Sequence, residues 1–301
     1  MKVLFTGLPY FGKQLVAELN VFDAKNTYVF CNTYYSKWER LRFLWHLITA
    51  KKVVSFNGVT SESLALNWTL RFRKALIMQW HGSDVLTAAE NKSNGKFTRK
   101  YVDVAQSYTD APWLKKELAE MNIAVSDLAF KHVSTSNFFE PFQSRNVITY
   151  LAQDNEEFYG LHHFLKLANQ FPDIQFHVVG SDGKNIQAPK NMIFHGWVSE
   201  EGFKTRLNEN AVFIRLTKHD GYSLSVLRAL ANGNYVIWNN PHPMVNYVEH
   251  MEQLPVVFGH LIERINEKTF ERNREAMEWV NENLDRKRIL EMYIQTILNK
   301  H

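Results

Sequence analysis

The chain has 301 residues, of which 45% are hydrophobic and 22% are charged, with 13 Gly and 8 Pro. This composition excludes disordered and fibrous proteins and leaves enough apolar side chains for the cores of two α/β domains. The formal charge of +4, from 35 basic and 31 acidic residues, is too balanced for a nucleic-acid-binding protein but suits anionic ligands or an anionic membrane surface.

The single cysteine, Cys31, lies in an apolar, strand-like run, so no intramolecular disulfide is expected and a reducing compartment is favoured. The opening residues, MKVLFTGLPYFGK, are interrupted too early by Gly, Pro and Lys for a signal peptide. No run approaches the roughly 18 apolar residues that a membrane-spanning helix needs. We therefore expect a cytoplasmic protein, either free or peripheral at the inner face of a membrane.

Residues 2–6 predict a first buried strand, and the segment from Gly7 to Gly12 leads from it into a helix. The segment continues with Lys13 and Gln14, so it lacks the Ser or Thr hydroxyl with which a P-loop holds Mg²⁺. Three interpretations stay open: a phosphate-binding P-loop, a plain strand-to-helix turn, and a glycine loop that faces a binding cleft.

Residues 28–32 predict a second strand, and Ser36 is placed to cap the helix that follows. Large apolar residues recur on one side of this helix, with basic residues nearby: Trp38, Leu41, Leu44, Trp45 and Ile48. Either this apolar side covers the sheet, or its tryptophans lie in the interface of a bilayer. The second interpretation predicts a weak contact with a membrane surface.

Two further strands are predicted over 53–56 and 75–80, with a helix over 62–73 between them. Asn57 follows the first of these strands, and His81-Gly-Ser-Asp84 follows the second. Ligands of parallel sheets bind outside the carboxyl ends of the strands, so His81 and Asp84 are placed to face a cleft. A histidine can polarise a sugar hydroxyl, and an aspartate can accept a hydrogen bond from one. The structural alternative is a satisfied loop histidine and an aspartate that caps a turn.

The polar segment 90–99 predicts a mobile loop, and residues 109–121 predict a helix. Residues 139–145 are polar, contain a proline and precede a new strand over 147–151, which makes them the best linker candidate. We therefore place a first domain at 1–141, a second at 142–285 and a final helix at 286–301.

The second domain again alternates helices and strands. A helix is predicted over 159–170, strands over 175–179 and 192–194, and another helix from Ser199. Gly180 follows the first of these strands, and Trp197 and Val198 follow the second. A turn glycine and a core tryptophan are the structural interpretations of Gly180 and Trp197.

Residues 211–216 and 235–238 predict two more strands, separated by a helix with apolar residues three or four positions apart. The loop before the helix contains two cations and a turn glycine: Arg215, Lys218, Asp220, Gly221, Tyr222, Ser223 and then Leu224. Ser223 is placed to cap the helix, whose free N–H groups and dipole favour an anion. The loop therefore predicts an anion site, unless both cations form surface ion pairs. Gly233 is placed to end the helix.

Beyond residue 240, we expect a helix over 244–250, a short edge strand over 256–258 and a strongly helical end over 267–300.

The order acidic residue, Gly, aromatic residue, amphipathic helix and Ala-x-x-x-Gly-x-x-Val-Ile resembles the donor-binding signature of GT-B glycosyltransferases, especially the GT4-like group. His-Gly-Ser-Asp at 81–84 is similar to a motif in the first domain of these enzymes, near the transferred sugar and the acceptor. The resemblance implies an α/β fold in which two Rossmann-like parallel-sheet domains face a cleft, with the last helix crossing back to the first domain.

It also implies a hexosyl or deoxyhexosyl transfer, retaining rather than inverting, from a nucleotide diphosphate-sugar to a glycan or lipid-linked glycan, in polysaccharide, glycolipid or glycoprotein glycan synthesis. No cofactor is implied, and the absence of an Asp-x-Asp pair leaves a metal unsupported. The expected catalytic residues are His81, Asp84 and Asp220. The expected donor-binding residues are Arg215, Lys218, Gly221, Tyr222, Ser223, Leu224, Gly180, Trp197 and Val198. Gly7, Gly12 and Asn57 are expected on the acceptor side.

Two departures from the family pattern affect the donor site. The family has a glutamate eight positions after the first acid, where it holds the ribose, but here Arg228 follows Asp220 at that spacing and cannot accept a hydrogen bond. The family also has Arg and Lys after the first strand of the second domain, whereas residues 152–159 contain neither. Arg215 and Lys218 are the natural substitutes. These departures leave a non-catalytic binding or regulatory subunit of the same fold as the alternative.

Overall fold

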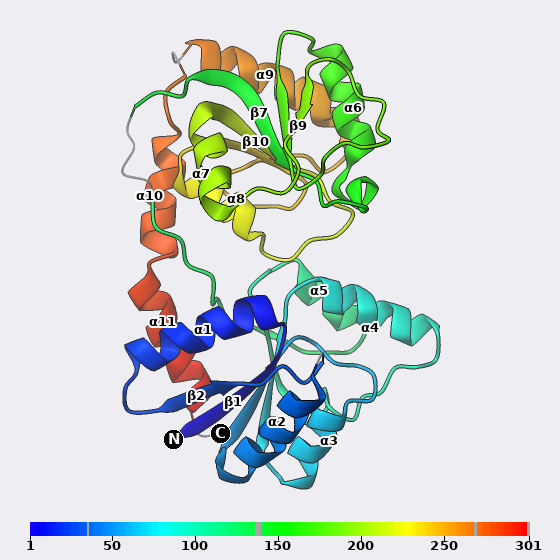
Figure 1. The fold of residues 1–301 in the computed structure, drawn as a ribbon, viewed down its shortest axis with the longest axis vertical. Coiled ribbons are helices and arrows are strands. Elements are labelled where there is room, and N and C mark those ends of the chain that lie inside the picture. Colours follow the sequence, from blue (N-terminus) through cyan, green and yellow to red (C-terminus); the bar gives the residue numbers. More distant parts are fainter. Residues whose placement is uncertain (35, 136–139, 268–269, 300–301) are drawn as a thin grey trace. The chain divides into compact units, whose positions relative to one another are not determined.

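The computed structural model describes residues 1–34, 36–135, 140–267 and 270–299 of the chain (Figure 1). Contacts divide the chain into two compact units: unit 1 contains Met1–Lys131 and Lys287–His301, and unit 2 contains His132–Arg286. The sequence had suggested domain limits at 141/142 and 285/286. Both units are α/β structures in which every strand pair is parallel, as predicted.

Unit 1 contains a sheet in the order β2-β1-β3-β4-β5-β6. Its strands are β1 (Lys2–Gly7), β2 (Thr27–Phe30), β3 (Lys52–Phe56), β4 (Ala75–Trp80), β5 (Gln106–Thr109) and β6 (Ser126–Asp127). Its helices are α1 (Pro9–Phe22), α2 (Lys37–Thr49), α3 (Leu64–Arg71), α4 (Ser83–Ser93), α5 (Leu114–Glu120) and, from the end of the chain, α11 (Arg286–Leu298).

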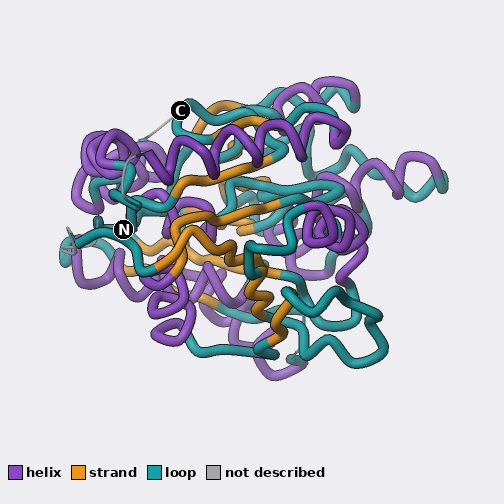
Figure 2. Tube along the Cα trace, turned by 90° about the horizontal axis from the view of Figure 1, so that it is seen from above, coloured by secondary structure: helices purple, strands orange, loops and turns teal. Residues whose placement is uncertain are grey.

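The core of unit 1 explains why its strands read as continuous apolar runs. Side chains that point either way from this sheet are buried, as expected when helices cover both faces. Figure 2 shows helices on either side of the strands. On one face α1 and α11 pack together, and α11 contributes Leu290, Tyr293 and Ile297 to a cluster with Val3 and Phe5. The Tyr293 hydroxyl donates to Gln79 Oε1 at 2.8 Å, which anchors α11 to β4.

Unit 2 contains a sheet in the order β12-β11-β10-β7-β8-β9. Its strands are β7 (Ser144–Tyr150), β8 (Phe176–Val179), β9 (Met192–Phe194), β10 (Asn210–Arg215), β11 (Tyr235–Trp238) and β12 (Asn246–Tyr247). Its helices are η1 (Glu156–Tyr159), α6 (Leu161–Gln170), α7 (Glu200–Glu209), α8 (Leu224–Ala231), η2 (Met251–Gln253), α9 (Leu254–Glu267) and α10 (Arg274–Asn283).

The strand order of each sheet reverses direction at one place, and a parallel sheet binds ligands at such a switch point. In unit 1 it lies between β1 and β3, and in unit 2 between β7 and β10. The residues that end these strands are therefore the first place to look for a site. Gly7 and Asn57 lie at the first switch point, and Tyr150 and Arg215 lie at the second.

The central element predictions are confirmed. Helix α8 and strand β11 have the predicted limits, and β10 differs from its prediction by one residue at each end. Ser36 caps α2 by accepting a hydrogen bond from the N–H of Glu39 at 3.2 Å. Gly233 follows α8 with a φ of 77°, a left-handed conformation that favours glycine.

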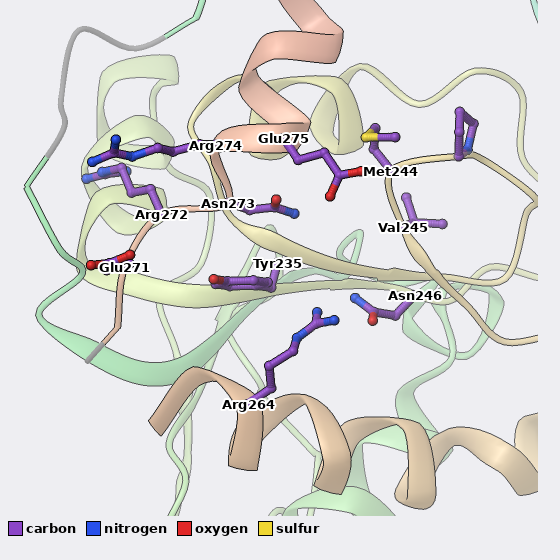
Figure 3. A pocket seen from close by; sticks show the side chains of 11 residues that line it. Tyr235, Met244, Val245, Asn246, Arg264, Glu271, Arg272, Asn273, Arg274 and Glu275 are labelled. Carbon is purple, nitrogen blue, oxygen red and sulfur yellow. The ribbon is translucent and has the colours of Figure 1, made fainter. Parts of the chain in front are cut away.

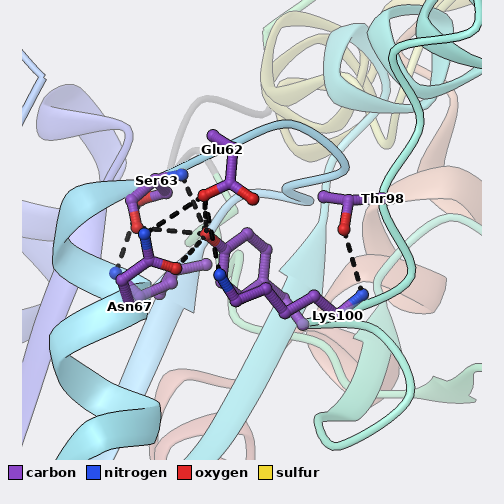
Figure 4. Close-up of polar contacts among 7 residues, drawn as sticks. Glu62, Ser63, Asn67, Thr98 and Lys100 are labelled. Atoms are coloured by element: carbon purple, nitrogen blue, oxygen red, sulfur yellow. Dashed lines mark hydrogen bonds and ion pairs between the residues drawn. The ribbon is translucent and has the colours of Figure 1, made fainter.

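The segment predicted as a mobile loop over 90–99 is partly helical, because α4 continues to Ser93. The residues after it are tied to the start of α3 (Figure 4). Tyr101 is fully buried, and its hydroxyl accepts from the N–H of Ser63 at 2.9 Å and donates to Asn67 Oδ1 at 2.7 Å. Within the segment, Asn91 Nδ2 donates to Thr60 Oγ1 at 3.1 Å and Lys92 Nζ donates to the Glu120 carbonyl at 3.0 Å.

Several other element predictions are wrong. Residues 106–109 form β5, so the helix predicted from 109 starts at Leu114. Residues 244–250 contain the short strand β12 instead of a helix, and residues 256–258 belong to α9 instead of an edge strand. In α9 the buried residues Leu254, Phe258, Leu261, Ile262 and Ile265 continue with helical spacing, which overrides the β-branched run.

Two segment predictions fall partly on residues that the structure does not describe. The predicted linker over 139–145 includes residue 139, which lies outside the described residues, and its last two residues already belong to β7. The predicted helical end over 267–300 includes residues 268, 269 and 300, which also lie outside them. The described part of this end contains two separate helices, α10 and α11.

Candidate functional site

The loop after β10 in unit 2 is built around a buried cation. Arg215 is 8% exposed, and its Nε donates to Asp220 Oδ2 at 2.8 Å. Its guanidinium lies 5.0 Å from the ring centroid of Tyr159 and 5.9 Å from that of Tyr150. Burial acts to lower the pKa of Arg215, but Asp220 and the tyrosines outweigh it, so the pKa is raised. The predicted surface ion pair of Arg215 is therefore a buried one.

The backbone of this loop is held from two sides. The N–H of Thr217 donates to Asn239 Oδ1 at 3.2 Å, and Asn239 Nδ2 donates to the Thr217 carbonyl at 2.7 Å. The N–H of Lys218 donates to the carbonyl of Phe158 at 2.9 Å. The Lys218 side chain is exposed. The loop thus combines a fixed backbone with one buried and one exposed cation.

Ser223 occupies the N-cap position of α8, but it does not cap the helix as predicted. Its hydroxyl lies 3.0 Å from the hydroxyl of Ser225, and no side-chain bond from Ser223 reaches the N–H groups of the first turn. The two hydroxyls satisfy each other, so Ser223 leaves these N–H groups open to another acceptor. Gly221 is buried beside them, and Leu224 begins the helix.

Tyr222 connects the loop to a partly buried histidine. Its hydroxyl lies 3.1 Å from Nε2 of His242, whose Nδ1 accepts from the N–H of Met244 at 3.1 Å. The ring of His242 also packs edge-on against Trp279, with centroids 4.6 Å apart. Burial lowers the pKa of His242 to about 4, so this histidine is neutral at pH 7.

The loops after β7, β8 and β9 meet beside the switch point. Gly180 has a φ of 94°, and a Cβ there would lie 2.6 Å from the carbonyl oxygen of Leu151, so the close approach requires glycine. Its N–H donates to the carbonyl of Gly196 at 2.7 Å. Next along the chain, Trp197 is 83% exposed, so the core interpretation of Trp197 is wrong, and Val198 is partly buried.

Two residues of the segment in which the family has cations hold one of these loops. Glu156 Oε1 accepts from the hydroxyl of Ser181 at 2.5 Å, and Gln153 Oε1 accepts from the N–H of Asp182 at 2.9 Å. Burial opposes ionisation of Glu156, but hydrogen bonds from Ser181 and the backbone outweigh it and lower its pKa. Glu156 and Gln153 therefore have a structural use in place of the cations of the family.

Arg228, at the position of the family glutamate, pairs with the start of α7. Its Nη2 donates to Glu200 Oε1 at 2.5 Å, and the Glu200 side chain is 69% exposed. This contact connects α8 to the helix that follows Trp197 and Val198.

In unit 1, Asp84 holds the loop after β4. Its carboxylate accepts from the N–H groups of Gly58 at 2.5 Å, His81 at 3.0 Å, Gly82 at 2.9 Å and Val85 at 3.0 Å. Burial raises the pKa of Asp84, and these four hydrogen bonds oppose the rise. The arrangement matches the structural alternative, in which this aspartate organises a turn.

His81 is 9% exposed and lies between two phenylalanines, with centroids 4.5 Å from Phe56 and 5.1 Å from Phe130. Among the described residues, neither ring nitrogen has a hydrogen-bond partner of ordinary geometry, although the Phe56 backbone is close enough to favour the protonated ring slightly. Burial, followed by the charge of Lys131, lowers the pKa of His81 well below 6.5. His81 is therefore a neutral group, and the satisfied-histidine interpretation is wrong.

A buried ion pair beside His81 was missed by the sequence analysis. Lys131 Nζ lies 2.8 Å from Asp110 Oδ2, and the two side chains are 7% and 0% exposed. Burial raises the pKa of Asp110, while Lys131 opposes the rise. Asp110 follows β5 as His81 follows β4. The signal was the position after a strand, which the predicted helix over 109–121 concealed.

The glycine segment of unit 1 is not a P-loop, because α1 already begins at Pro9. Gly12 lies inside this helix, where a Cβ would be 2.5 Å from the Phe30 ring, so close packing explains it. Gly7 has a φ of 116°, and a Cβ there would be 2.5 Å from Asn57 Oδ1. Asn57 is 9% exposed and donates from Nδ2 to the Tyr34 hydroxyl at 2.8 Å. Gly7 and Asn57 thus come together at the switch point.

A separate cavity of about 350 Å³ lies at the amino end of β11 in unit 2 (Figure 3). Arg264 points toward the ring of Tyr235, with its guanidinium 5.4 Å from the centroid. Arg272 is committed to the backbone, because it donates to the carbonyls of Glu140 at 2.8 Å and Asn232 at 2.7 Å. No site residue predicted from the sequence lines this cavity, and it lies at the opposite end of the strands from Arg215.

No protein-family model matches the chain, and no curated protein matches it. Solved structures do. The pneumococcal O-GlcNAc transferase GtfA, in complex with UDP and GlcNAc, has a TM-score of 0.60 at 13% identity over 85% of this chain, which spans 58% of that chain. The chain likewise spans 59% of S. aureus TarM.

Two further similar structures match over nearly their whole length. Sucrose-phosphate synthase from Thermosynechococcus elongatus has a TM-score of 0.69 at 11% identity, covering 99% of this chain and 98% of that one. WaaG, a glycosyltransferase involved in lipopolysaccharide biosynthesis, has a TM-score of 0.58 at 10% identity, covering 100% of both chains. Together with the two parallel sheets, these likenesses show that this chain has the two-domain GT-B fold.

Proposed function

We propose that this protein is a glycosyltransferase that moves a sugar from a nucleotide diphosphate-sugar to an acceptor hydroxyl. The observation that carries the proposal is Arg215, a buried cation at the switch point of unit 2, beside the exposed Lys218 and the N-terminus of α8. Burying a guanidinium is costly unless an opposite charge compensates it, and Asp220 does so here. The pair also lies at the switch point, where parallel sheets bind their ligands.

The diphosphate of the donor carries two negative charges and gains a third as its bond to the sugar breaks, and preformed cations and N–H groups stabilise such a leaving group. Lys218 is free to turn toward a phosphate because its side chain is exposed while its backbone is held by Phe158. The N–H groups in the first turn of α8 are not capped by the Ser223 side chain, so they are open to a phosphate oxygen. The chain has no Asp-x-Asp pair, so we assign the phosphate charges to these groups and not to a metal.

The remaining roles follow from the same positions. Arg215 holds Asp220 at 2.8 Å, which orients a carboxylate toward the hydroxyls of the transferred sugar. Gly180, Trp197 and Val198 lie on the neighbouring loops, where the exposed indole offers a surface on which a base can stack. In unit 1, the neutral ring of His81 can accept a hydrogen bond from an acceptor or sugar hydroxyl.

The geometry of Asp84 favours retention at the anomeric carbon. An inverting transfer needs a carboxylate that is available as a general base, and Asp84 was the first candidate. Its oxygens already accept four backbone hydrogen bonds, so they are not available to take the proton of an acceptor hydroxyl. We therefore assign to Asp84 the role of holding the loop after β4, and we propose that the enzyme is a retaining one. The acceptor that we propose is a glycan or a lipid-linked glycan.

The test begins with binding. Calorimetric titration with uridine, thymidine and guanosine diphosphates should give saturable binding of at least one, and Lys218→Ala should weaken it by about tenfold, the size of one charge-assisted contact. Lys190→Ala is the matched control, because Lys190 is also an exposed lysine but precedes the amino end of β9. Donor hydrolysis with a panel of nucleotide sugars should then show turnover. Absence of any nucleotide binding would overturn the proposal and favour a non-catalytic subunit.

A further inference from the structure

Helix α2 exposes an apolar stripe. Four large side chains point away from the sheet, with exposed fractions of 82% for Trp38, 58% for Leu41, 72% for Trp45 and 58% for Ile48. Their spacings of three, four and three residues place them on one side of the helix, along about 15 Å of its length. The sheet is covered instead by Phe43 and Leu47, both fully buried. The interpretation in which the stripe covers the sheet is therefore wrong.

Helix α3 extends the stripe into a surface. It contributes Leu64 at its start, 50% exposed, and Phe72 follows its end, 41% exposed. The ends of the two helices are joined, because Lys74 Nζ donates to the Ile48 carbonyl at 3.2 Å. We call the exposed faces of α2 and α3, with the residues that end them, the α2–α3 surface. Monomeric proteins rarely leave so many large apolar side chains exposed together unless something binds there.

The charge of the chain is concentrated in the same segment. Residues 37–75 contain eight Lys and Arg residues and two acids, whereas the whole chain contains 35 and 31, so the rest of the chain is slightly acidic. One of the acids, Glu39, is paired with Arg42 at 3.2 Å. Four of these cations are exposed near the apolar residues in the sequence: Lys37 begins α2, Lys51 follows its end, and Arg71 and Arg73 stand on either side of Phe72. Any partner of this surface should therefore be both apolar and anionic.

We propose that the α2–α3 surface binds an anionic lipid bilayer. Tryptophan suits the boundary between headgroups and acyl chains, because its ring is apolar and its N–H is polar. Lysine and arginine beside such rings reach anionic headgroups with their charged ends while their stems remain in the apolar layer. Among the described helices, none is long and apolar enough to cross a bilayer, so the contact is a surface one.

Flotation of the full chain with vesicles tests this proposal without a sugar donor, so its outcome is independent of the proposed function. At low salt the protein should float with phosphatidylcholine vesicles that contain phosphatidylglycerol, far more than with phosphatidylcholine alone, and its tryptophan emission should shift to the blue. Raising the salt should release it. The double variant Trp38→Ala/Trp45→Ala should lose at least tenfold in vesicle affinity.

Trp197→Ala is the matched control for vesicle binding, because Trp197 is 83% exposed in unit 2 and should leave flotation unchanged. Arg71→Gln/Arg73→Gln should weaken binding to the anionic vesicles by roughly tenfold or more and flatten its salt dependence. All substituted side chains are exposed, so circular dichroism and thermal unfolding should stay as in the parent protein.

Failure of the unmodified protein to float with anionic vesicles would overturn the proposal. So would equal flotation of the Trp38→Ala/Trp45→Ala variant. If the unmodified protein instead forms dimers in sedimentation experiments, and this variant is monomeric without any vesicle binding by either, the surface is an interface between two copies of the chain.

Discussion

The His81 loop of unit 1 and the Arg215 loop of unit 2 each contain an aspartate, but the two aspartates have different hydrogen-bond partners. Each loop follows a strand at the carboxyl end of a parallel sheet. Asp84 accepts hydrogen bonds from backbone N–H groups, whereas Asp220 pairs with the side chain of Arg215. Backbone bonds define the path of a loop. A side-chain pair can exchange one partner for a ligand while the loop keeps its shape.

The largest effect should come from removing the charge of Asp84. Asp84→Asn replaces one accepting oxygen by an NH₂ group that faces backbone donors, and it should lower the free energy of unfolding by about 3 kcal/mol. Asp103→Asn is the control, because Asp103 is 52% exposed in a surface pair with Arg99 and should cost under about 1 kcal/mol. Urea denaturation measures both, and hydrogen exchange should quicken at the amides of Gly58 and Gly82. Similar small costs for the two variants would mean that the carboxylate does not organise the loop.

Asp220→Asn should have a smaller cost that a ligand can recover. The substitution leaves the buried guanidinium of Arg215 without its carboxylate, and we expect a loss of about 2 kcal/mol in the ligand-free protein. A bound nucleoside diphosphate would give Arg215 a new anion, so the ligand should raise the Tm of this variant more than that of the parent protein.

The control for Asp220→Asn is Glu209→Gln, which removes a partly exposed ion pair with Arg206 before β10. It should leave the ligand-induced rise in Tm unchanged. If Asp220→Asn and the parent protein gain the same rise, Arg215 does not contact the diphosphate.

His81 should make unit 1 less stable in acid. Because folding lowers the pKa of His81 from 6.5, the unfolded chain binds a proton that the folded one does not, and stability falls as the pH drops below 6.5. His81→Phe and His81→Gln remove this term. As the pH is lowered from 7 to 5, the free energy of unfolding of each variant should therefore rise by about 1.5 kcal/mol relative to that of the parent protein. Urea denaturation at a series of pH values measures this change. If the difference in unfolding free energy between variant and parent is the same at pH 7 and pH 5, His81 is solvated.

Arg228→Ala should have the smallest effect. Its pair with Glu200 is partly exposed, so we expect a loss below about 1 kcal/mol in stability. Nucleoside diphosphate affinity should change less than threefold if position 228 no longer binds the ribose. Calorimetry decides this, and a tenfold loss would make Arg228 a donor-binding residue in its own right.

Sequence patterns predicted the parallel two-domain fold and the limits of α8 and β11, because strand and helix periods are local properties. They also predicted that Gly7, Asn57 and Arg215 lie at the carboxyl ends of strands, which is where the structure has the switch points. They could not show how polar groups pair. That Asp84 turns to the backbone, that Asp220 binds Arg215, and that Glu156 holds Ser181 all depend on contacts between separate loops.

The missed Asp110 and the misjudged α2 stripe have different physical causes. Asp110 was hidden by a helix prediction at a short strand, where four residues carry little periodic signal. Helix α2 has apolar residues on two sides, and the sequence pattern does not tell which side faces the sheet. Phe43 and Leu47 bury the other side.

The placement of α11 sets an order on the making of this protein. Leu290, Tyr293 and Ile297 fill a core whose other members precede residue 131, so the whole of unit 2 is translated in between. During synthesis, the face of unit 1 that α11 covers therefore stays exposed until unit 2 has been translated. A released chain that is truncated before Tyr293 should therefore contain a folded second unit and a first unit that chaperones and proteases still recognise.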